Sequence, residues 1–382
     1  MSTREAVIEL FGEETTLSER QRLLRTIRDT VGEDVVRVPR RADDALEEIR
    51  KAVRAGHLLP EQLVAALQDA EENGNQHIMY YVSVKDKTRI FADGEAVAQA
   101  IFGATDWYVR QGFPNLASPT GDAFEWADFR IGLPGKPHDW VAKFYTPESR
   151  EEPVPAGEVQ AWITAQTGVA HDGAGTDLTS DEHVQAWITA QIGVAPNPAW
   201  RFNFTRPVRF RSVLLARWNH PGILELRVSR RGLDSRTTLA TREEAIWTRL
   251  ARAIKKDDLS AWDLGPVRSN MVRAEARGGM PFRTSRTTLR TALGTHVAFE
   301  RPTDEEAMSA DEVASRSIAG LMSDGGRNEV LTVNFLADRS DDALEQDLLV
   351  IAGVARAHEV VIRAQSSARA IDYVTDQFRA HR

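Results

Sequence analysis

Apolar and polar positions in the first 75 residues repeat at the spacing of amphipathic helices. A capping-box pattern at Ser18 and Gln21 predicts the start of one helix. A second helical pattern covers 43–56, where an aspartate can cap the N-terminus and a glycine ends it. Pro60 suits the first turn of a third helix, which Gly74 ends.

Two runs in the same part of the chain have the composition of strands. A short one covers Asp34–Val38 and a longer one covers His77–Val84. The turn Lys85–Lys87 and the run Thr88–Ala92 predict that the longer strand returns as a hairpin. The resulting order of helix, strand, helix, helix and hairpin is that of a winged helix.

In a winged helix, the third helix would read DNA. Here that helix, 60–73, carries Glu61, Asp69, Glu71 and Glu72. Carboxylates oppose contact with phosphates, which call for cations. A packing or protein-contact role for this helix is therefore favoured over DNA reading, and both stay open.

The middle of the chain is rich in predicted strands. One helix is expected at Glu95–Phe102, followed by strands at Trp126–Ile131 and Asp139–Tyr145. Val208–Trp218 and Ile223–Val228 flank an Asn-His-Pro-Gly turn, which predicts a β-hairpin.

Beyond the hairpin, helical and strand patterns alternate. Thr241 and Glu244 form a capping box for a helix that reaches about residue 256, and Ser285–Leu293 is a short helix candidate. Residues 260–282 show no regular pattern. Further helices are expected at 303–320, 341–354 and 366–380, with strands at Val330–Leu336 and Glu359–Arg363.

These patterns predict an α+β fold. A helical N-terminal domain with winged-helix-like order, 1–92, ends in a β-hairpin, and a loop-rich β region follows at 93–200. A basic region of hairpin and helix at 201–300 completes an antiparallel β-rich middle, and 301–382 forms a small α/β C-terminal part. A length of 382 residues agrees with two or three domains.

A near-perfect tandem repeat lies in the loop-rich region. Val159–Ala170 reads VQAWITAQTGVA and Val184–Ala195 reads VQAWITAQIGVA, so eleven of twelve positions match at a period of 25. Two copies are too few for a solenoid. An inserted surface loop is favoured over a doubled contact segment that uses its tryptophans.

Composition narrows the class of protein. The chain has no cysteine, which excludes disulfides, thiol catalysis and thiolate zinc sites. It lacks an apolar run long enough for a membrane helix, and its charged N-terminus is no signal peptide. Arginine outnumbers lysine 41 to 7, as codon bias in a GC-rich bacterial genome would produce. We therefore expect a bacterial cytoplasmic protein that does not contact membranes.

Charge is unevenly distributed along the chain. Residues 201–300 hold 20 basic and 9 acidic residues, a net charge of +11. The whole chain has 48 basic and 56 acidic residues, so the remainder carries 28 and 47, a net charge of −19. Such asymmetry is typical of nucleic-acid binding or of docking to an acidic protein.

Eight cationic residues of the basic region are the candidate nucleic-acid site. Three are expected on the outer face of one helix, and two more lie four residues apart. The last three are expected beside the start of, and along, the short helix at 285–293. The set comprises Arg249, Arg252, Lys256, Arg273, Arg277, Arg283, Arg286 and Arg290. Guanidinium groups suit phosphate because they donate in a planar fork.

Motifs for common chemistries are missing. The chain has no phosphate-binding loop, no G-x-S-x-G elbow and no H-E-x-x-H zinc motif. Glu225-Leu226-Arg227 has arginine where a PD-(D/E)xK nuclease needs lysine, and Asp139 and Lys143 are one residue out of register. We favour a cross-strand ion pair for Glu225. The acidic loop 171–183 lacks the ligand spacing of a metal site, so no metal or cofactor is expected.

One stretch resembles a known family. Arg54–Leu59, then Leu63 and Leu67, then Gln76–Tyr81 resemble the end of the N-terminal helical domain of the Chl4/centromere protein N family. The strands within Val208–Val228 are loosely similar as well. The resemblance implies a basic groove that binds DNA and protein together without catalysis.

Three functions follow from the sequence. The first is a non-enzymatic protein that binds nucleic-acid backbone through 201–300. The second is an interaction subunit whose basic face docks an acidic partner or a second copy of the chain. The third is an unrecognised or degenerate nuclease-like enzyme.

Overall fold

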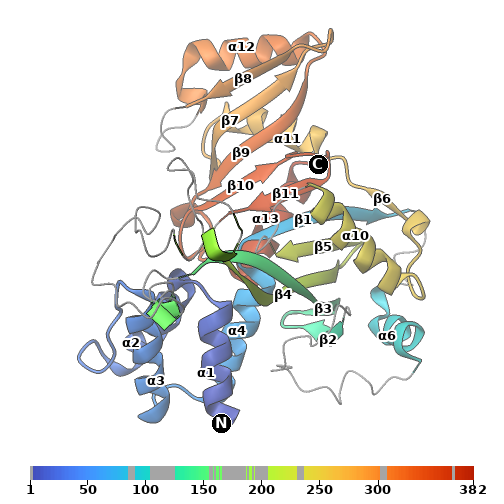
Figure 1. The fold of residues 1–382 in the computed structure, drawn as a ribbon. Coiled ribbons are helices and arrows are strands. Elements are labelled where there is room, and N and C mark those ends of the chain that lie inside the picture. Colours follow the sequence, from blue (N-terminus) through green and yellow to red (C-terminus); the bar gives the residue numbers. More distant parts are fainter. Residues whose placement is uncertain are drawn as a thin grey trace. The chain divides into compact units, whose positions relative to one another are not determined.

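The computed structural model describes residues 3–84, 91–103, 125–154, 205–229, 236–301, 308–363 and 366–382, with scattered positions between 158 and 193. The described part has N-terminal helices, one large antiparallel sheet and further helices toward the C-terminus (Figure 1). This arrangement confirms the predicted α+β class.

The chain divides into two compact units. Unit 1 comprises Met1–Thr146 and Ser212–Arg382, and unit 2 comprises Pro147–Arg211. Unit 2 contains both copies of the tandem repeat, and most positions of both copies lie outside the described residues. The acidic loop 171–183 also lies outside them.

Four helices open the chain, and they share a core of their own. They are α1 (Thr3–Glu14), α2 (Leu17–Val31), α3 (Ala42–Arg54) and α4 (Pro60–Asn73). Phe11, Leu24, Ile49 and Leu67 are among its buried side chains. The helices therefore fold as a bundle on their own apolar stripes.

The sheet draws strands from most of the chain. Its order is β2-β3-β4-β5-β1-β11-β10-β9-β7-β8, with β6 paired to β1 at the side. The N-terminal strands are β1 (Gln76–Ser83), β2 (Glu125–Leu133) and β3 (Lys136–Pro153), and β4 (Thr205–Asn219), β5 (Ile223–Ser229) and β6 (Leu259–Ala261) follow. The remaining strands are β7 (Phe282–Arg290), β8 (His296–Glu300), β9 (Arg327–Phe335), β10 (Leu348–Ala352) and β11 (Glu359–Ile362).

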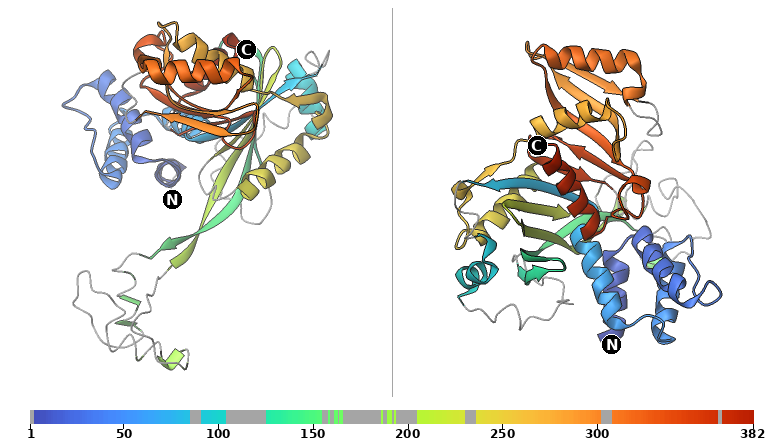
Figure 2. Two further views of the ribbon diagram at one scale, coloured as in Figure 1. Left: turned by 90° about the horizontal axis from the view of Figure 1, so that it is seen from above. Right: turned by 180° about the vertical axis from the view of Figure 1, so that it is seen from behind.

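Helices cover both faces of the sheet, and the residues of β1 alternate between two cores. Ile78 and Tyr80 enter a core with α11 (Gly265–Glu275), α12 (Glu312–Ser323) and α13 (Ala368–Ala380). Met79 and Tyr81 enter a second core with α6 (Gly94–Phe102) and α10 (Arg236–Leu250). Figure 1 shows α10 in front of the sheet, and the view from behind in Figure 2 shows α13 across the opposite face.

Several sequence predictions are confirmed closely. Helix α4 begins at Pro60 and has its C-cap at Gly74. Strands β4 and β5 form the predicted hairpin, with Trp218 opposite Leu224. The first predicted capping box lies two residues earlier, because Thr16 and Glu19 provide it.

Two predicted helices are strands instead. The stretch 285–293 falls largely in β7, where Thr284, Thr287 and Leu289 face the core at a two-residue period, apart from a register shift. The second, 341–354, contains β10, which pairs with β9 and β11. In both cases pairing to neighbouring strands overrides a local pattern that also fits a helix.

Other predictions need smaller corrections. Asp34–Val38 forms no strand, because Val36 is buried among the N-terminal helices. The expected hairpin after β1 is wrong where it can be checked, since Phe91 and Ala92 are helical and β1 pairs with β5 and β11. Helix α10 starts at Arg236 rather than beside Thr241, and the irregular stretch 260–282 contains α11. Within 303–320, α12 begins only at Glu312.

Candidate functional site

A cavity of about 720 Å³ lies in unit 1 between the sheet and two helices. Helix α4 and helix α13 form two of its walls, and the turn between β2 and β3 forms a third. Arg217 of β4 and Arg227 of β5 line it from the sheet. We call this space the sheet cavity.

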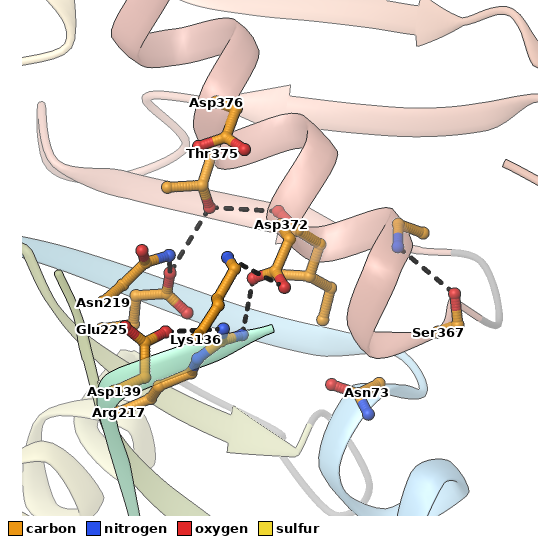
Figure 3. Close-up of polar contacts among 12 residues, drawn as sticks. Asn73, Lys136, Asp139, Arg217, Asn219, Glu225, Ser367, Asp372, Thr375 and Asp376 are labelled. Carbon is orange, nitrogen blue, oxygen red and sulfur yellow. Dashed lines mark hydrogen bonds and ion pairs between the residues drawn. The ribbon is translucent and has the colours of Figure 1, made fainter. Parts of the chain in front are cut away.

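Arg217 and Arg227 belong to a network of buried charges, and Figure 3 shows Arg217 with Asp139 and Asp372. Arg217 Nη2 lies 3.0 Å from Asp139 Oδ2, and its Nη1 lies 2.6 Å from Asp372 Oδ1. Arg227 Nη2 lies 2.5 Å from Glu225 Oε2, and its Nη1 donates to Asn73 Oδ1 at 2.8 Å. The network thereby joins β3, β4, β5, α4 and α13.

Glu225 is the most enclosed carboxylate of this network. Burial by itself would raise its pKa, but the guanidinium groups of Arg227 and Arg217 outweigh that effect and lower the pKa to about 2. Asn219 Nδ2 also donates to Glu225 Oε1 at 2.9 Å. The expected ion pair of Glu225 therefore forms within β5, with Arg227, and not across strands. Arg217 stands opposite Glu225 in the β4–β5 register, but its ion pairs are with Asp139 and Asp372.

Helix α4 contributes two buried carboxylates beside the cavity. Lys143 of β3, with no exposed side-chain surface, has Nζ 2.5 Å from Glu71 Oε2 and 3.4 Å from Glu72 Oε1. Arg130 Nη2 lies 2.5 Å from Glu72 Oε2. These acidic residues thus hold α4 against the sheet, which agrees with the packing role favoured for this helix.

The carboxylates that a nuclease would use to hold a metal ion are engaged in ion pairs here. Glu225 is committed to Arg227, and Asp139 is committed to Arg217. Within the part of the chain that the structure describes, no three His, Cys, Asp or Glu side chains gather as a metal site would require.

The eight predicted cationic residues fall into three separate groups. Arg249 lies in α10, whereas Arg252 follows in a turn and Lys256 in a 3₁₀ turn, so the three share no helix. Lys256 Nζ lies 3.8 Å from Glu243 Oε1 and 5.6 Å from the centre of the Trp247 ring.

Arg273 and Arg277 form the second group, at the C-terminal end of α11 and just beyond it. Both are exposed. Because α11 belongs to the core on the α13 side of the sheet, these two arginines lie apart from the third group.

Arg283, Arg286 and Arg290 form the third group, on the outward side of β7. Successive pairings cross the sheet from this strand to β1. Arg286 pairs with Thr332, which pairs with Ile351 on its other side, and Ile351 is joined in the same way through Val361 to His77. Residues paired across antiparallel strands project to the same face. His77 alternates with Ile78 of the α13-side core, so Arg286 projects to the α10 side of the sheet.

Beyond the strands that α10 covers, the described residues leave this side of the sheet accessible. Its outward positions are all exposed or half-buried, whereas the alternate positions of β7, β9 and β10 are mostly buried. We call these outward positions the β7 face. It comprises Arg283, Arg286, Thr288 and Arg290 of β7, His296, Ala298 and Glu300 of β8, Val330, Thr332 and Asn334 of β9, and Leu349 and Ile351 of β10.

Comparisons with known proteins identify no family for this chain. No protein-family model matches the chain. No curated protein matches it. The resemblance of its N-terminal part to the centromere protein N family therefore stays a prediction. Among the described residues, no helix has the length and apolar character needed to span a membrane.

Proposed function

We propose that this protein binds the phosphate backbone of nucleic acid through the β7 face, without catalysis and without sequence preference. The observation that carries the proposal is the placement of Arg283, Arg286 and Arg290 on one open side of one strand. Arg286 and Arg290 are four residues apart, which is about 13 Å along a strand, and Arg283 lies on the same side beyond the register shift between Thr284 and Arg286.

Weak carboxylate partners leave Arg286 and Arg290 available for phosphate. Arg286 Nη1 lies 3.8 Å from Glu300, and Arg290 Nη1 lies 3.6 Å from Glu329. The side chains of Arg286 and Arg290 are 49% and 56% exposed. Exposed pairs of this kind contribute only about 0–1 kcal/mol, so phosphate can replace the carboxylates at little cost.

The composition of the β7 face favours backbone contacts over base reading. None of its twelve positions is phenylalanine, tyrosine or tryptophan, and His296 is its one ring that could stack on a base, whereas a sheet that stacks several bases needs several such rings. Backbone contacts carry no sequence information. Binding is therefore expected to tolerate changes of sequence.

The test is a charge reversal of all three arginines. Arg283→Glu, Arg286→Glu and Arg290→Glu together should weaken binding to a duplex by about 10²-fold or more at ~0.1 M salt. The slope of log K against log salt should fall by about 3, since each neutralised phosphate contributes about 0.9. Gel shifts over a salt series measure both quantities.

A matched variant reverses three arginines in α12 and at the C-terminal end of α11, on the α13 side of the sheet. Arg273→Glu, Arg277→Glu and Arg316→Glu make the same change in net charge, and all three residues are exposed. This variant should bind nearly as the parent does. Equal binding by the β7-face variant and the parent would refute the proposal.

Two results would favour the other functions. If the parent binds no nucleic acid at about 50 mM salt, where backbone contacts are strongest, the β7 face serves an acidic protein partner or a second copy of the chain. Metal-dependent cleavage of DNA would instead support a nuclease-like enzyme.

A further inference from the structure

We propose that the sheet cavity binds a small organic anion, which has an apolar body and one carboxylate or phosphate group. Its volume of about 720 Å³ falls within the range of small-molecule sites. This site is independent of the β7 face. Arg227 stands opposite Ile78 and therefore faces the α13 side of the sheet, whereas the arginines of β7 face the α10 side.

The charges of the lining favour an anion. The cavity is lined by five cationic residues (Arg130, Lys136, Arg217, Arg227 and Arg369) and four carboxylates (Asp69, Glu72, Asp372 and Asp376). All four carboxylates already have cationic partners, at 2.8 Å for Asp69, 2.5 Å for Glu72, 2.6 Å for Asp372 and 3.0 Å for Asp376. A cationic ligand would have to compete with these ion pairs.

Donors, in contrast, are in excess. Lys136 Nζ lies 3.1 Å from Asp372 Oδ2, and an ammonium group has three donors, so two can serve a ligand. The Lys136 side chain is 27% exposed, which makes its ammonium group accessible. Arg369 Nη2 donates to the backbone oxygen of Asp341 at 3.1 Å, which leaves its positive charge for a ligand.

Two more donors in the wall lack an acceptor. The Arg217 Nε–H and Tyr373 O–H groups are enclosed, and neither has a hydrogen-bond partner among the described residues. Arg217 is only 4% exposed. Two acceptors of the same wall, Glu72 Oε1 and Asp372 Oδ1, also lack a hydrogen bond within the described part of the chain. Each of them lies beside a cation, however, at 3.4 Å from Lys143 Nζ and 2.6 Å from Arg217 Nη1. In the same described part the two donors have no such neighbour, and because enclosed polar groups are usually satisfied, they point to a ligand that supplies acceptors.

Apart from the amides Gln68 and Asn73, the rest of the lining is apolar and selects the body of the ligand. Leu133, Val141, Leu215 and Ala368 contribute aliphatic surface, and Tyr373 contributes a ring. An aliphatic or aromatic body would pack there while its anionic group meets the donors of Lys136 and Tyr373. Carboxylate and phosphate head groups share the chemistry that these donors require, because each is an anion with several oxygen atoms that accept hydrogen bonds.

The test titrates the full chain with hexanoate, hexyl phosphate, hexylammonium, hexanol and inorganic phosphate. Calorimetry and thermal melting should show saturable binding of hexanoate or hexyl phosphate, and the stronger of the two identifies the head group. The ammonium compound and the alcohol should bind at least tenfold more weakly. If neither anion binds more tightly than hexylammonium, the proposal is wrong.

Two variants place the binding in the sheet cavity. Lys136→Gln and Tyr373→Phe should each reduce the affinity for the preferred anion about tenfold, the expected effect of losing a hydrogen bond to a charged group. Lys51→Gln, at an exposed lysine of α3, is the control and should bind as the parent does.

Thermal melting shows whether either variant fails to fold. Tyr373→Phe removes a hydroxyl without a described partner, so this variant should melt at or above the temperature of the parent. Unchanged affinity in both folded variants would overturn the assignment. Nucleic-acid binding should be unaffected in either one, which separates this proposal from that for the β7 face.

Discussion

Glu225 shows how a single charge is kept inside this protein. Its side chain has no exposed surface, and it contacts Arg227 and Asn219. Glu225→Gln would leave the Arg227 guanidinium buried without its carboxylate. We expect the free energy of unfolding at pH 7 to fall by about 3–5 kcal/mol, as when one partner of a buried pair is removed. Urea denaturation measures the change.

The same residue predicts a pH dependence. The pKa of Glu225 is about 2 in the folded chain and 4.5 when unperturbed. A lowered folded-state pKa stabilises the protein fully above the unfolded value, and the stabilisation is lost as the pH falls toward the folded value. The stability difference between the parent and Glu225→Gln should therefore shrink from pH 5 to pH 2.

A surface glutamate provides the control for both experiments. Glu300 is 63% exposed and lies 3.8 Å from Arg286. Glu300→Gln should change the free energy of unfolding by less than about 0.5 kcal/mol at any of these pH values. A Glu225→Gln variant as stable as this control would show that the buried network contributes nothing net.

Among the elements, the turn between β10 and β11 offers a test of backbone strain. Gly353 has a φ of +83°, and a Cβ there would collide with the backbone oxygen of Glu329 and lie 2.9 Å from the Arg268 guanidinium. Gly278 has a φ of +81°, but a Cβ there would meet no atom within 4 Å. The two glycines therefore share a left-handed backbone, but a side chain has room at Gly278 and none at Gly353.

We expect alanine to act differently at these two positions. Gly278→Ala should cost about 1 kcal/mol, the penalty for a left-handed backbone. Gly353→Ala should cost at least about 2 kcal/mol more, because the clash forces β9 or the turn to move. Thermal or urea unfolding of the two variants measures the loss of unfolding free energy in each. Equal losses would show that the turn can relax freely.

The elements also show what the sequence can predict. Helix α4, helix α6 and the β4–β5 hairpin follow from proline, glycine and capping signals that act within a few residues. Strands β7 and β10 could not be predicted in this way. Their identity depends on pairing with β9, whose paired residues lie up to 53 positions away in the chain (Phe282 with Phe335).

The candidate sites, too, could be predicted only as far as local sequence signals define them. The arginines of β7 were found from their charge, but a helix was expected to present them, and the strand with its register shift does so instead. The sheet cavity was not found. Its lining comes from α4, the β2–β3 turn, β4, β5 and α13, and no local spacing links these segments.

At the scale of the whole molecule, unit 2 interrupts the sequence of unit 1, and it includes the end of β3 and the start of β4. Because unit 1 holds its own cores, replacing 147–211 by a short Gly/Ser turn should leave unit 1 folded. We expect its melting temperature to change by less than about 4 °C, which corresponds to about 1 kcal/mol. Calorimetry of the shortened chain measures it.

A smaller deletion tests the tandem repeat. Removing 171–195, one period of 25 residues, changes the closure entropy of the segment only slightly, so the melting temperature should hardly move. A large fall in either deletion variant would show that unit 1 depends on contacts made by this segment.

The position of β1 in the sheet has a consequence for synthesis. Met79 pairs with Glu359, a residue made 280 positions later. At about 5–20 residues per second, a ribosome needs about 14–56 s to deliver that partner. The helices before β1 have their own core and can form at once, whereas β1 must wait with an unpaired edge, which is prone to aggregation. During translation, this segment is therefore where a chaperone would be needed most.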